Sequence, residues 1–336
     1  MKRVLRVLLC VVALALPALS GSAQAGSPPA TVSIVTVVPY DVTAYDSSLS
    51  KFIENRRGNQ DRLFETAQFF IGMPYLLEPL GEGVGAKYSE EPLYRTDKFD
   101  CVSYVNTVLS LAHANDLTQF KKNILNARYA GFSPDYIHRT DWFTDLEWIP
   151  NIQRLGWIVD VTWNIVDRQQ QPIALMAKTL IDKPNWYVKR PLNAMHRLAP
   201  LPPESQKLLD TLHQQSQKFS AQPSTLSYLP LNRLFDAEGH PDPFLFNQIP
   251  SGSVIFIVRP DWNIRDDFNN FPGYPNGYGT NLNVSHLGFA FRTEADLEFC
   301  NSSSLHGKVI CEPLTTYLHK YLDSPTIKGI HVEKVV

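Results

Sequence analysis

The chain changes from a helical first half to a strand-rich C-terminal part, and this order limits the folds that it can adopt. Apolar residues recur at helical spacing in three segments of the first half, 51–71, 101–115 and 117–127. Short strand-like runs and one short helix end the chain, at 251–258, 283–291, 297–301, 308–311 and 314–321. Separation of helices and strands along a chain predicts the α+β class, with an antiparallel sheet.

Cys101 opens the second of these helices. The apolar residues after it form one face, at Val102, Val105, Leu109 and Ala112. Asp100, just before it, is a suitable N-cap residue and a candidate support for the site. A cysteine at a helix N-terminus lies at the positive end of the helix dipole, which stabilises a thiolate. The sequence therefore predicts that Cys101 is a nucleophile with a lowered pKa.

A partner for this thiol is found near the other end of the chain. His286 begins an apolar, strand-like run, where its imidazole can project toward the start of a helix and act as the general base. Asn301, on the next predicted strand, can accept a hydrogen bond from one imidazole nitrogen and leave the other for the sulfur. His306 is an alternative third member. These residues predict a Cys-His-Asn hydrolase site.

Oxyanion stabilisation needs hydrogen-bond donors near the attacked carbonyl. The backbone N–H of Cys101 is one candidate, and the hydroxyl of Tyr75, after a predicted turn at 72–75, is another. Substrate-binding candidates lie in polar, aromatic stretches of the chain and are Arg128, Tyr136, Arg139, Trp142 and Tyr278. Arginine can bind a substrate carboxylate through two hydrogen bonds, and aromatic rings can stack on sugars.

The N-terminus resembles a secretory signal peptide over residues 1–25. Three basic residues precede the apolar run 7–19, and Ala23-Gln24-Ala25 fits a cleavage site. The apolar run is too short to cross a membrane, so we expect no stable membrane insertion once it is removed. Cys10 lies inside the run and not behind small residues at its end, which argues against lipidation. The sequence therefore predicts a periplasmic or secreted protein.

Cysteine usage supports a single reactive thiol. After cleavage Cys101, Cys300 and Cys311 remain, and an odd number in an exported protein leaves one unpaired. Cys300 and Cys311 flank a turn-like segment and either form a hairpin disulfide or remain as two buried thiols. In both cases Cys101 is the cysteine without a partner.

Composition excludes several classes of partner. The formal net charge is −2, and removal of three basic leader residues brings it to about −5. A mildly acidic chain with no Lys/Arg run does not favour nucleic acid or an anionic membrane surface. The nine histidines show no metal-ligand spacing, so no metal or other cofactor is predicted.

The domain prediction is a signal peptide (1–25), an extended segment (26–50) and one catalytic domain (51–336). Residues 171–250 are rich in proline and polar residues and contain one predicted helix near 203–220. They show no pattern of a separate domain. We interpret them as a long insertion that decorates the core.

Several motifs in this order resemble the N-acetylmuramoyl-L-alanine amidase-like family, a branch of the NlpC-type papain-like cysteine peptidases. The matching stretches are Gly72-Met73-Pro74-Tyr75, Phe99 to Val105, Arg128 to Gly131, Asp141-Trp142, Gly156 to Thr162, Ser285 to Gly288, Asn301 to Ser303 and Tyr317-Leu318. The resemblance implies a papain-like fold with Cys101 as nucleophile and His286 as base. The third position of this branch is commonly histidine, where this chain has Asn301. A shift of one residue in the alignment would put Cys300 there.

The leading functional prediction is a cysteine amidase that cleaves the N-acetylmuramoyl-L-alanine bond of peptidoglycan or a muropeptide. One alternative is an endopeptidase for the γ-D-glutamyl–diamino-acid bond of the stem peptide. A second is a non-catalytic module that binds cell-wall glycan, and a third is a thiol enzyme that transfers the acyl group to an amine. A Cys-His pair serves both hydrolysis and transfer, so the residues leave these open.

Overall fold

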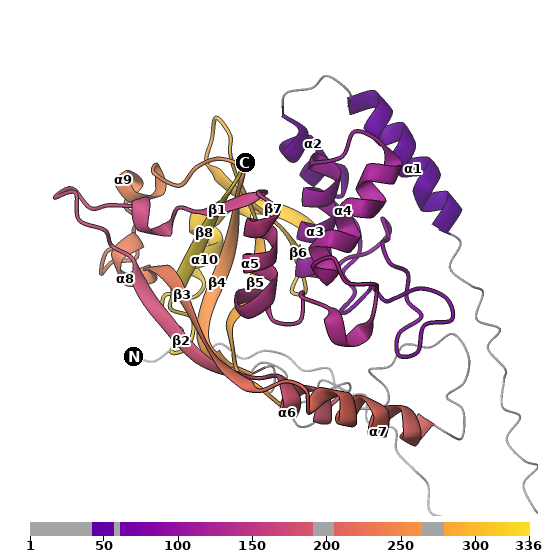
Figure 1. The fold of residues 1–336 in the computed structure, drawn as a ribbon. Coiled ribbons are helices and arrows are strands. Elements are labelled where there is room, and N and C mark those ends of the chain that lie inside the picture. The colour runs from indigo at the N-terminus through magenta and orange to yellow at the C-terminus, as the bar shows by residue number, and fades with distance from the viewer. Residues whose placement is uncertain (1–41, 57–60, 191–204, 264–278) are drawn as a thin grey trace, which may run out of the picture. The chain divides into compact units, whose positions relative to one another are not determined.

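The computed structural model describes residues 42–56, 61–190, 205–263 and 279–336, which contain helices and an antiparallel sheet (Figure 1). The predicted α+β class is confirmed. The predicted signal peptide, 1–25, and the first part of the segment 26–50 lie outside the described residues. Among the helices in the described ranges, none is long and apolar enough to cross a membrane.

Helices fill much of the first half of the chain. The α-helices are α1 (Val42–Arg56), α2 (Arg62–Phe69), α3 (Cys101–Ala112), α4 (Leu117–Tyr129), α5 (Ile149–Arg154), α6 (Lys183–Val188), α7 (Ser205–Ser216), α8 (Leu231–Leu234), α9 (Pro243–Phe246) and α10 (Leu314–His319). Short helical turns are η1 (Tyr136–His138), η2 (Thr144–Trp148, a π-helix) and η3 (Thr162–Asn164). The predicted helices at 101–115, 117–127 and 203–220 correspond to α3, α4 and α7.

Helix α1 corrects the expectation of an extended segment over 26–50, because residues 42–50 are helical. Leu49 and Ile53 lie one turn apart and are buried. Asp46 of the same helix accepts a hydrogen bond from Lys121 of α4 at 2.7 Å. Serines and threonines surround these few apolar residues in the sequence, so contact with α4, and not local pattern, decides the helix.

The strands form a sheet in the order β2-β3-β8-β4-β5-β6-β7, in which every neighbouring pair is antiparallel, and β1 pairs with β8 beside this path. Their bounds are β1 (Ile158–Asp160), β2 (Leu175–Asp182), β3 (Ala221–Pro230), β4 (Ser253–Trp262), β5 (Leu282–Arg292), β6 (Leu297–Ser303), β7 (Lys308–Pro313) and β8 (Gly329–Val335). The four predicted strand runs lie in β4, β5, β6 and β7.

The two faces of the central strands bury different helices. On one face, Tyr104 of α3 packs edge-on against Phe289 of β5, with ring centroids 6.0 Å apart. The buried apolar cluster on that face joins α3 and α4 to β4 and β5. On the other face, α8, α9 and α10 cover Ile255 and Ile257. Alternation along β4 and β5 therefore fixes both which side chains meet α3 and which meet α10.

The prediction that residues 171–250 decorate the core from outside is wrong. These residues supply two strands of the sheet, β2 and β3. β2 and β3 pair from Leu175–Tyr228 to Asp182–Ala221, and the end of β3 pairs with β8. Helices α6 and α7 lie beside this two-stranded ribbon (Figure 1). The strand pattern of β2 is weak in the sequence because the exposed Met176 and Leu180 are apolar and the buried Thr179 is polar.

Candidate active site

Cys101 is the first residue of α3, as the sequence predicts. Asp100 caps the N-terminus of α3 through two reciprocal hydrogen bonds with Ser103. The Asp100 carboxylate accepts from the Ser103 N–H at 2.7 Å, and the Asp100 N–H donates to Ser103 Oγ at 2.9 Å. This capping box satisfies two groups at the helix start and fixes where the chain enters α3. The thiol is therefore held at a defined end of the helix.

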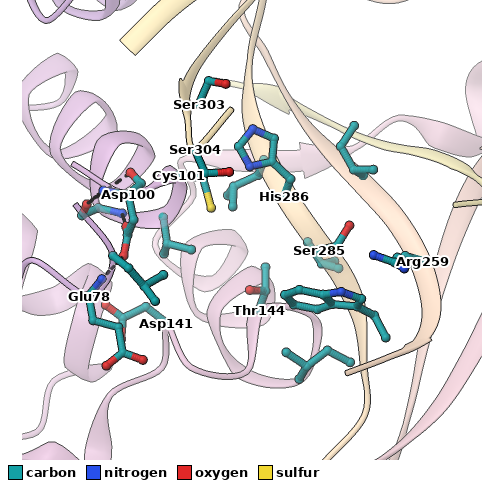
Figure 2. Close-up of a pocket in the computed structure, with 18 of the residues that line it drawn as sticks. Glu78, Asp100, Cys101, Asp141, Thr144, Arg259, Ser285, His286, Ser303 and Ser304 are labelled. Carbon is teal, nitrogen blue, oxygen red and sulfur yellow. Dashed lines mark hydrogen bonds between the residues drawn. The ribbon is translucent and has the colours of Figure 1, made fainter. Parts of the chain in front are cut away.

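A cavity of about 530 Å³ lies next to this helix start. Figure 2 shows the Cys101 sulfur and the His286 imidazole on adjoining walls of this cavity. Both side chains are partly exposed, and Tyr75 also lines the cavity. Residues almost two hundred positions apart in the sequence thus face one space, which is what nucleophile and base need.

A bulge in β5 sets the direction of His286. Ile257 of β4 pairs with His286 and Val258 pairs with Val284, so Ser285 is an additional residue in β5. A bulge redirects the side chains beside it, and such bulges are common next to active sites. The sequence contains no recognisable sign of this irregularity.

Asn301 accepts a hydrogen bond from the imidazole. The distance between His286 Nε2 and Asn301 Oδ1 is 2.9 Å, and Asn301 is fully buried. An amide oxygen only accepts, so Nε2 carries the proton and Nδ1 is left as the basic nitrogen. Burial lowers the pKa of His286, which favours the neutral, basic form, although the Asn301 hydrogen bond partly opposes this.

Gly288 allows this pair to form. A Cβ at this position would lie 2.7 Å from the Cβ of Asn301 and 2.6 Å from the carbonyl oxygen of Cys300. Both contacts are shorter than real Cβ atoms show, so only glycine lets β6 approach closely enough here.

The alternatives for the third position are placed elsewhere. His306 Nδ1 lies 3.0 Å from Ser303 Oγ, in the turn between β6 and β7. Cys300 forms a disulfide with Cys311, at directly opposed positions of β6 and β7. Cys101 is the free cysteine among the described residues.

The acidity of the thiol differs from the sequence prediction. Burial, and secondly the Asp100 carboxylate, raise the pKa of Cys101 to about 12, although backbone N–H groups, that of Leu287 first, act in the opposite direction. The pKa of Asp100 is itself raised to about 6, chiefly by burial, so this group is ionised at neutral pH. The helix N-terminus therefore does not produce a thiolate in the free protein, and a base must remove the proton during reaction.

Tyr75 is held beside the helix start by backbone hydrogen bonds. Residues 74–76 run along Phe99: the Phe99 N–H donates to the Pro74 carbonyl at 3.0 Å, and the Leu76 N–H donates to the Phe99 carbonyl at 2.9 Å. The Tyr75 N–H donates to the Gly307 carbonyl at 2.8 Å. The position of Tyr75 on the cavity wall is compatible with the predicted oxyanion donor.

The two arginines predicted to bind substrate are engaged inside the protein. Arg128 contacts Asp141 at 3.2 Å and donates to the Gly81 and Leu93 carbonyls. Arg139 donates to Glu82, with 2.9 Å between Nη2 and Oε2. Both reach the cavity wall, yet both are almost fully buried and paired with carboxylates. Their charges are already balanced, which corrects the expectation of a carboxylate-binding cation at either position.

The aromatic candidates have different outcomes. Tyr136 is buried, accepts a hydrogen bond from Arg190 at 2.9 Å and is absent from the wall of the main cavity, which corrects its assignment as a substrate contact. Trp142 lines the cavity, and the guanidinium carbons of Arg139 and Arg190 lie 4.9 and 4.6 Å from its ring centroid. Tyr278 lies outside the described residues.

Comparison with models of known protein families identifies the family of this chain. The model of the N-acetylmuramoyl-L-alanine amidase-like family matches residues 65–327, a range that contains Cys101, His286 and Asn301. The chain belongs to the N-acetylmuramoyl-L-alanine amidase-like family. A comparison with curated proteins found no match.

Solved structures share the fold of this chain. A crystal structure of a protein from Legionella pneumophila strain Philadelphia 1 is 38% identical, covers 88% of this chain and 95% of its own, and has a TM-score of 0.81. An N-acetylmuramoyl-L-alanine amidase from Bacteroides uniformis is 23% identical, covers 82% of this chain and 97% of its own, and has a TM-score of 0.52. The second likeness shows the shared fold.

Several cavity residues of this amidase-like chain were not predicted from the sequence. Trp186 reaches the cavity from α6, in the segment interpreted as an insertion, and Tyr317 reaches it from α10. Trp186 packs on Trp142, with ring centroids 4.8 Å apart. No spacing in the sequence links these residues to Cys101, because the sheet topology alone brings them together.

Proposed function

We propose that this protein is a cysteine amidase of peptidoglycan that hydrolyses the amide between N-acetylmuramic acid and L-alanine. The observation that carries the proposal is the hydrogen bond from His286, which lines the same cavity as Cys101, to the buried Asn301. Membership in the amidase-like family supports the substrate class. The helix-borne thiol and strand-borne histidine support a papain-like arrangement of NlpC type.

In the proposed reaction, Nδ1 of His286 takes the thiol proton as the sulfur attacks the lactyl carbonyl carbon. A tetrahedral oxyanion forms, which the backbone N–H of Cys101 and the hydroxyl of Tyr75 stabilise. The C–N bond then breaks, and the imidazolium gives its proton to the amine of L-alanine. The remaining muramoyl thioester is attacked by water, again with His286 as base, which restores the thiol and releases the lactyl carboxylate.

The pKa values of the site require that proton transfer accompany the attack, because a thiol of raised pKa does not give its proton to a base of lowered pKa beforehand. The pKa of Cys101 is raised to about 12, so the thiol keeps its proton until a carbonyl is bound. Burial lowers the pKa of His286, so the base is neutral and ready over a wide range of pH. Because the thiolate is the reactive form of cysteine, a protonated Cys101 protects the free enzyme from modification at this residue.

The pairing of two arginines favours the muramoyl amide over the γ-D-glutamyl bond, although Arg259 also lines the cavity. The γ-D-glutamyl bond carries a neighbouring carboxylate, and the cations expected to bind it, Arg128 and Arg139, are paired with Asp141 and Glu82. We further propose that the leader at 1–25 exports the enzyme, which would bring it to peptidoglycan in the periplasm or outside the cell.

The test is mass spectrometry of defined muropeptides after incubation with the mature protein and with its Cys101→Ala variant. Free stem peptide plus peptide-free disaccharide, formed only with Cys101 present, is the expected result. Disaccharide dipeptide plus a diamino-acid fragment would replace the proposal by an endopeptidase. Binding of muropeptide without any product would replace it by a glycan-binding module, and transfer of the muramoyl group to added amine would indicate a transferase.

A further inference from the structure

The imidazole of His286 has an aromatic neighbour on its face. The ring of Tyr317 lies nearly parallel to it, with 24° between the planes and 6.1 Å between the centroids. Phe299 of β6 meets the same imidazole edge-on, at 78° and 6.1 Å. These values fall in the range of favourable offset and edge contacts between rings.

Tyr317 is itself held firmly. Its ring is 6% exposed and packs against Phe299 at 4.7 Å and Tyr321 at 5.4 Å between centroids. Burial raises the pKa of its hydroxyl well above the ordinary value, and the neighbouring Tyr321 acts in the same direction. Helix α10, which carries it, packs on β6 and β7, the two strands joined by the Cys300–Cys311 disulfide. The ring of Tyr317, held by these contacts, can in turn hold the imidazole of His286.

Tyr317 also lines the cavity that exposes the nucleophile, Cys101. The imidazole of His286 is thus surrounded by Asn301 at Nε2, Tyr317 on a face and Phe299 at an edge.

We propose that Tyr317 is a positioning residue, whose ring holds the plane of the His286 imidazole so that Nδ1 faces the Cys101 sulfur. One hydrogen bond at Nε2 fixes a single point of the ring and leaves rotation about that contact. A stacked ring removes this freedom. The aromatic face also attracts the imidazolium that forms during attack. The inference rests on the proposed role of His286 as base.

Three variants separate the ring from the hydroxyl. Tyr317→Leu removes the stack, Tyr317→Phe keeps it, and Tyr321→Phe removes only the hydroxyl at Tyr321. Loss of orientation acts on the chemical step, so Tyr317→Leu should lower kcat about tenfold on muropeptide with KM nearly unchanged. Tyr317→Phe and Tyr321→Phe should keep most of the activity.

A measurement independent of activity is NMR titration of the His286 imidazole. Burial lowers the pKa of His286 in the native protein, so removal of its aromatic cover in Tyr317→Leu should move that pKa upward toward its ordinary value. Tyr317→Phe should titrate as the native protein does. Thermal melting identifies a variant that does not fold, and Tyr317→Met, which fills the space without a ring, then takes the place of Tyr317→Leu.

Two results would overturn the inference. One is a folded Tyr317→Leu or Tyr317→Met protein with native kcat and native His286 titration. The other is a Tyr317→Phe protein as impaired as Tyr317→Leu, which would assign the effect to the hydroxyl. If no muropeptide is cleaved by the native protein but the titration still shifts in Tyr317→Leu, the proposed function fails and the positioning of His286 by Tyr317 stands.

Discussion

Ser302 Oγ donates a hydrogen bond to the backbone carbonyl of Phe99 at 2.8 Å. This contact joins β6 to the residue that lies two positions before Cys101. The neighbouring residue on β6, Asn301, accepts a hydrogen bond from His286. Consecutive residues of one strand have side chains on opposite faces. Ser302 therefore holds the segment that leads into Cys101, and Asn301 holds the imidazole of His286.

Ser302→Ala should weaken this registration. Loss of one buried hydrogen bond costs about 1 kcal/mol of stability, and the entry to α3 becomes freer to move. We expect a lower melting temperature and a fall in kcat of about two- to tenfold. Ser48→Ala, at an exposed position of α1, is the matched control. Native kcat in a Ser302→Ala protein with a lowered melting temperature would show that the contact serves stability alone.

Cys101→Ala and His286→Ala should each abolish hydrolysis without unfolding the protein. The attack needs the thiol and the proton transfer needs the imidazole, so we expect losses of at least about a thousandfold in kcat/KM. Initial rates on muropeptide measure this, with the exposed His240→Ala as control for loss of a histidine. A folded and fully active Cys101→Ala protein would end the cysteine mechanism.

Asn301→Ala should retain part of the activity. Asn301 selects the imidazole tautomer but does not touch the reacting atoms, and the Tyr317 stack remains in the variant. We expect a reduction of kcat of about ten- to a hundredfold. A loss as complete as that of Cys101→Ala would mean that the hydrogen bond is required for any productive orientation of His286.

Asp100→Asn should make the thiol more acidic. The Asp100 carboxylate is the second cause, after burial, of the raised pKa of Cys101, and asparagine is also a good N-cap residue. Below its pKa, a thiol that loses one pKa unit gains about tenfold in thiolate. The rate of Cys101 alkylation by iodoacetamide should therefore rise at every pH between about 7 and 9. An unchanged or slower rate would contradict the assigned effect of this carboxylate.

The acid side of the activity profile should reflect His286. Because burial lowers the pKa of this histidine, the neutral base persists below the ordinary histidine titration. The acid limb of kcat/KM against pH is expected below about 6.5. A limb above that value would show that the imidazole is more solvated than in this structure, or that another group controls activity. The Asn301→Ala variant lacks the hydrogen bond that raises the pKa of His286. The acid limb of its pH profile should therefore lie at a lower pH than that of the native protein.

Local features of the sequence predicted the carriers of the chemistry. Helical spacing after Cys101, a capping residue at Asp100 and an apolar strand at His286 are each encoded by residues close together in the chain. Elements of this kind form wherever their apolar face finds a partner. The strand that carries Asn301 was also predicted from its own composition.

Tertiary contacts decided the rest. Arg128 and Arg139 carry the same charge in the sequence whether they face substrate or a buried carboxylate, and only Asp141 and Glu82, brought from other segments, determine which. The same holds for α1, whose apolar residues gain partners from α4 and, where Phe52 stacks on Phe69, from α2.

The sequence by itself determined that a thiol opens a helix and that an imidazole lies on a strand, although that strand begins at Leu282 and not at His286 as predicted. The fold alone decided that Asn301 and not His306 meets His286, that Tyr317 covers the imidazole, and that burial raises the pKa of the Cys101 thiol. The physical reason is that helix and strand formation depend on neighbours along the chain. Hydrogen-bond partners, burial and the resulting pKa values depend on neighbours in space.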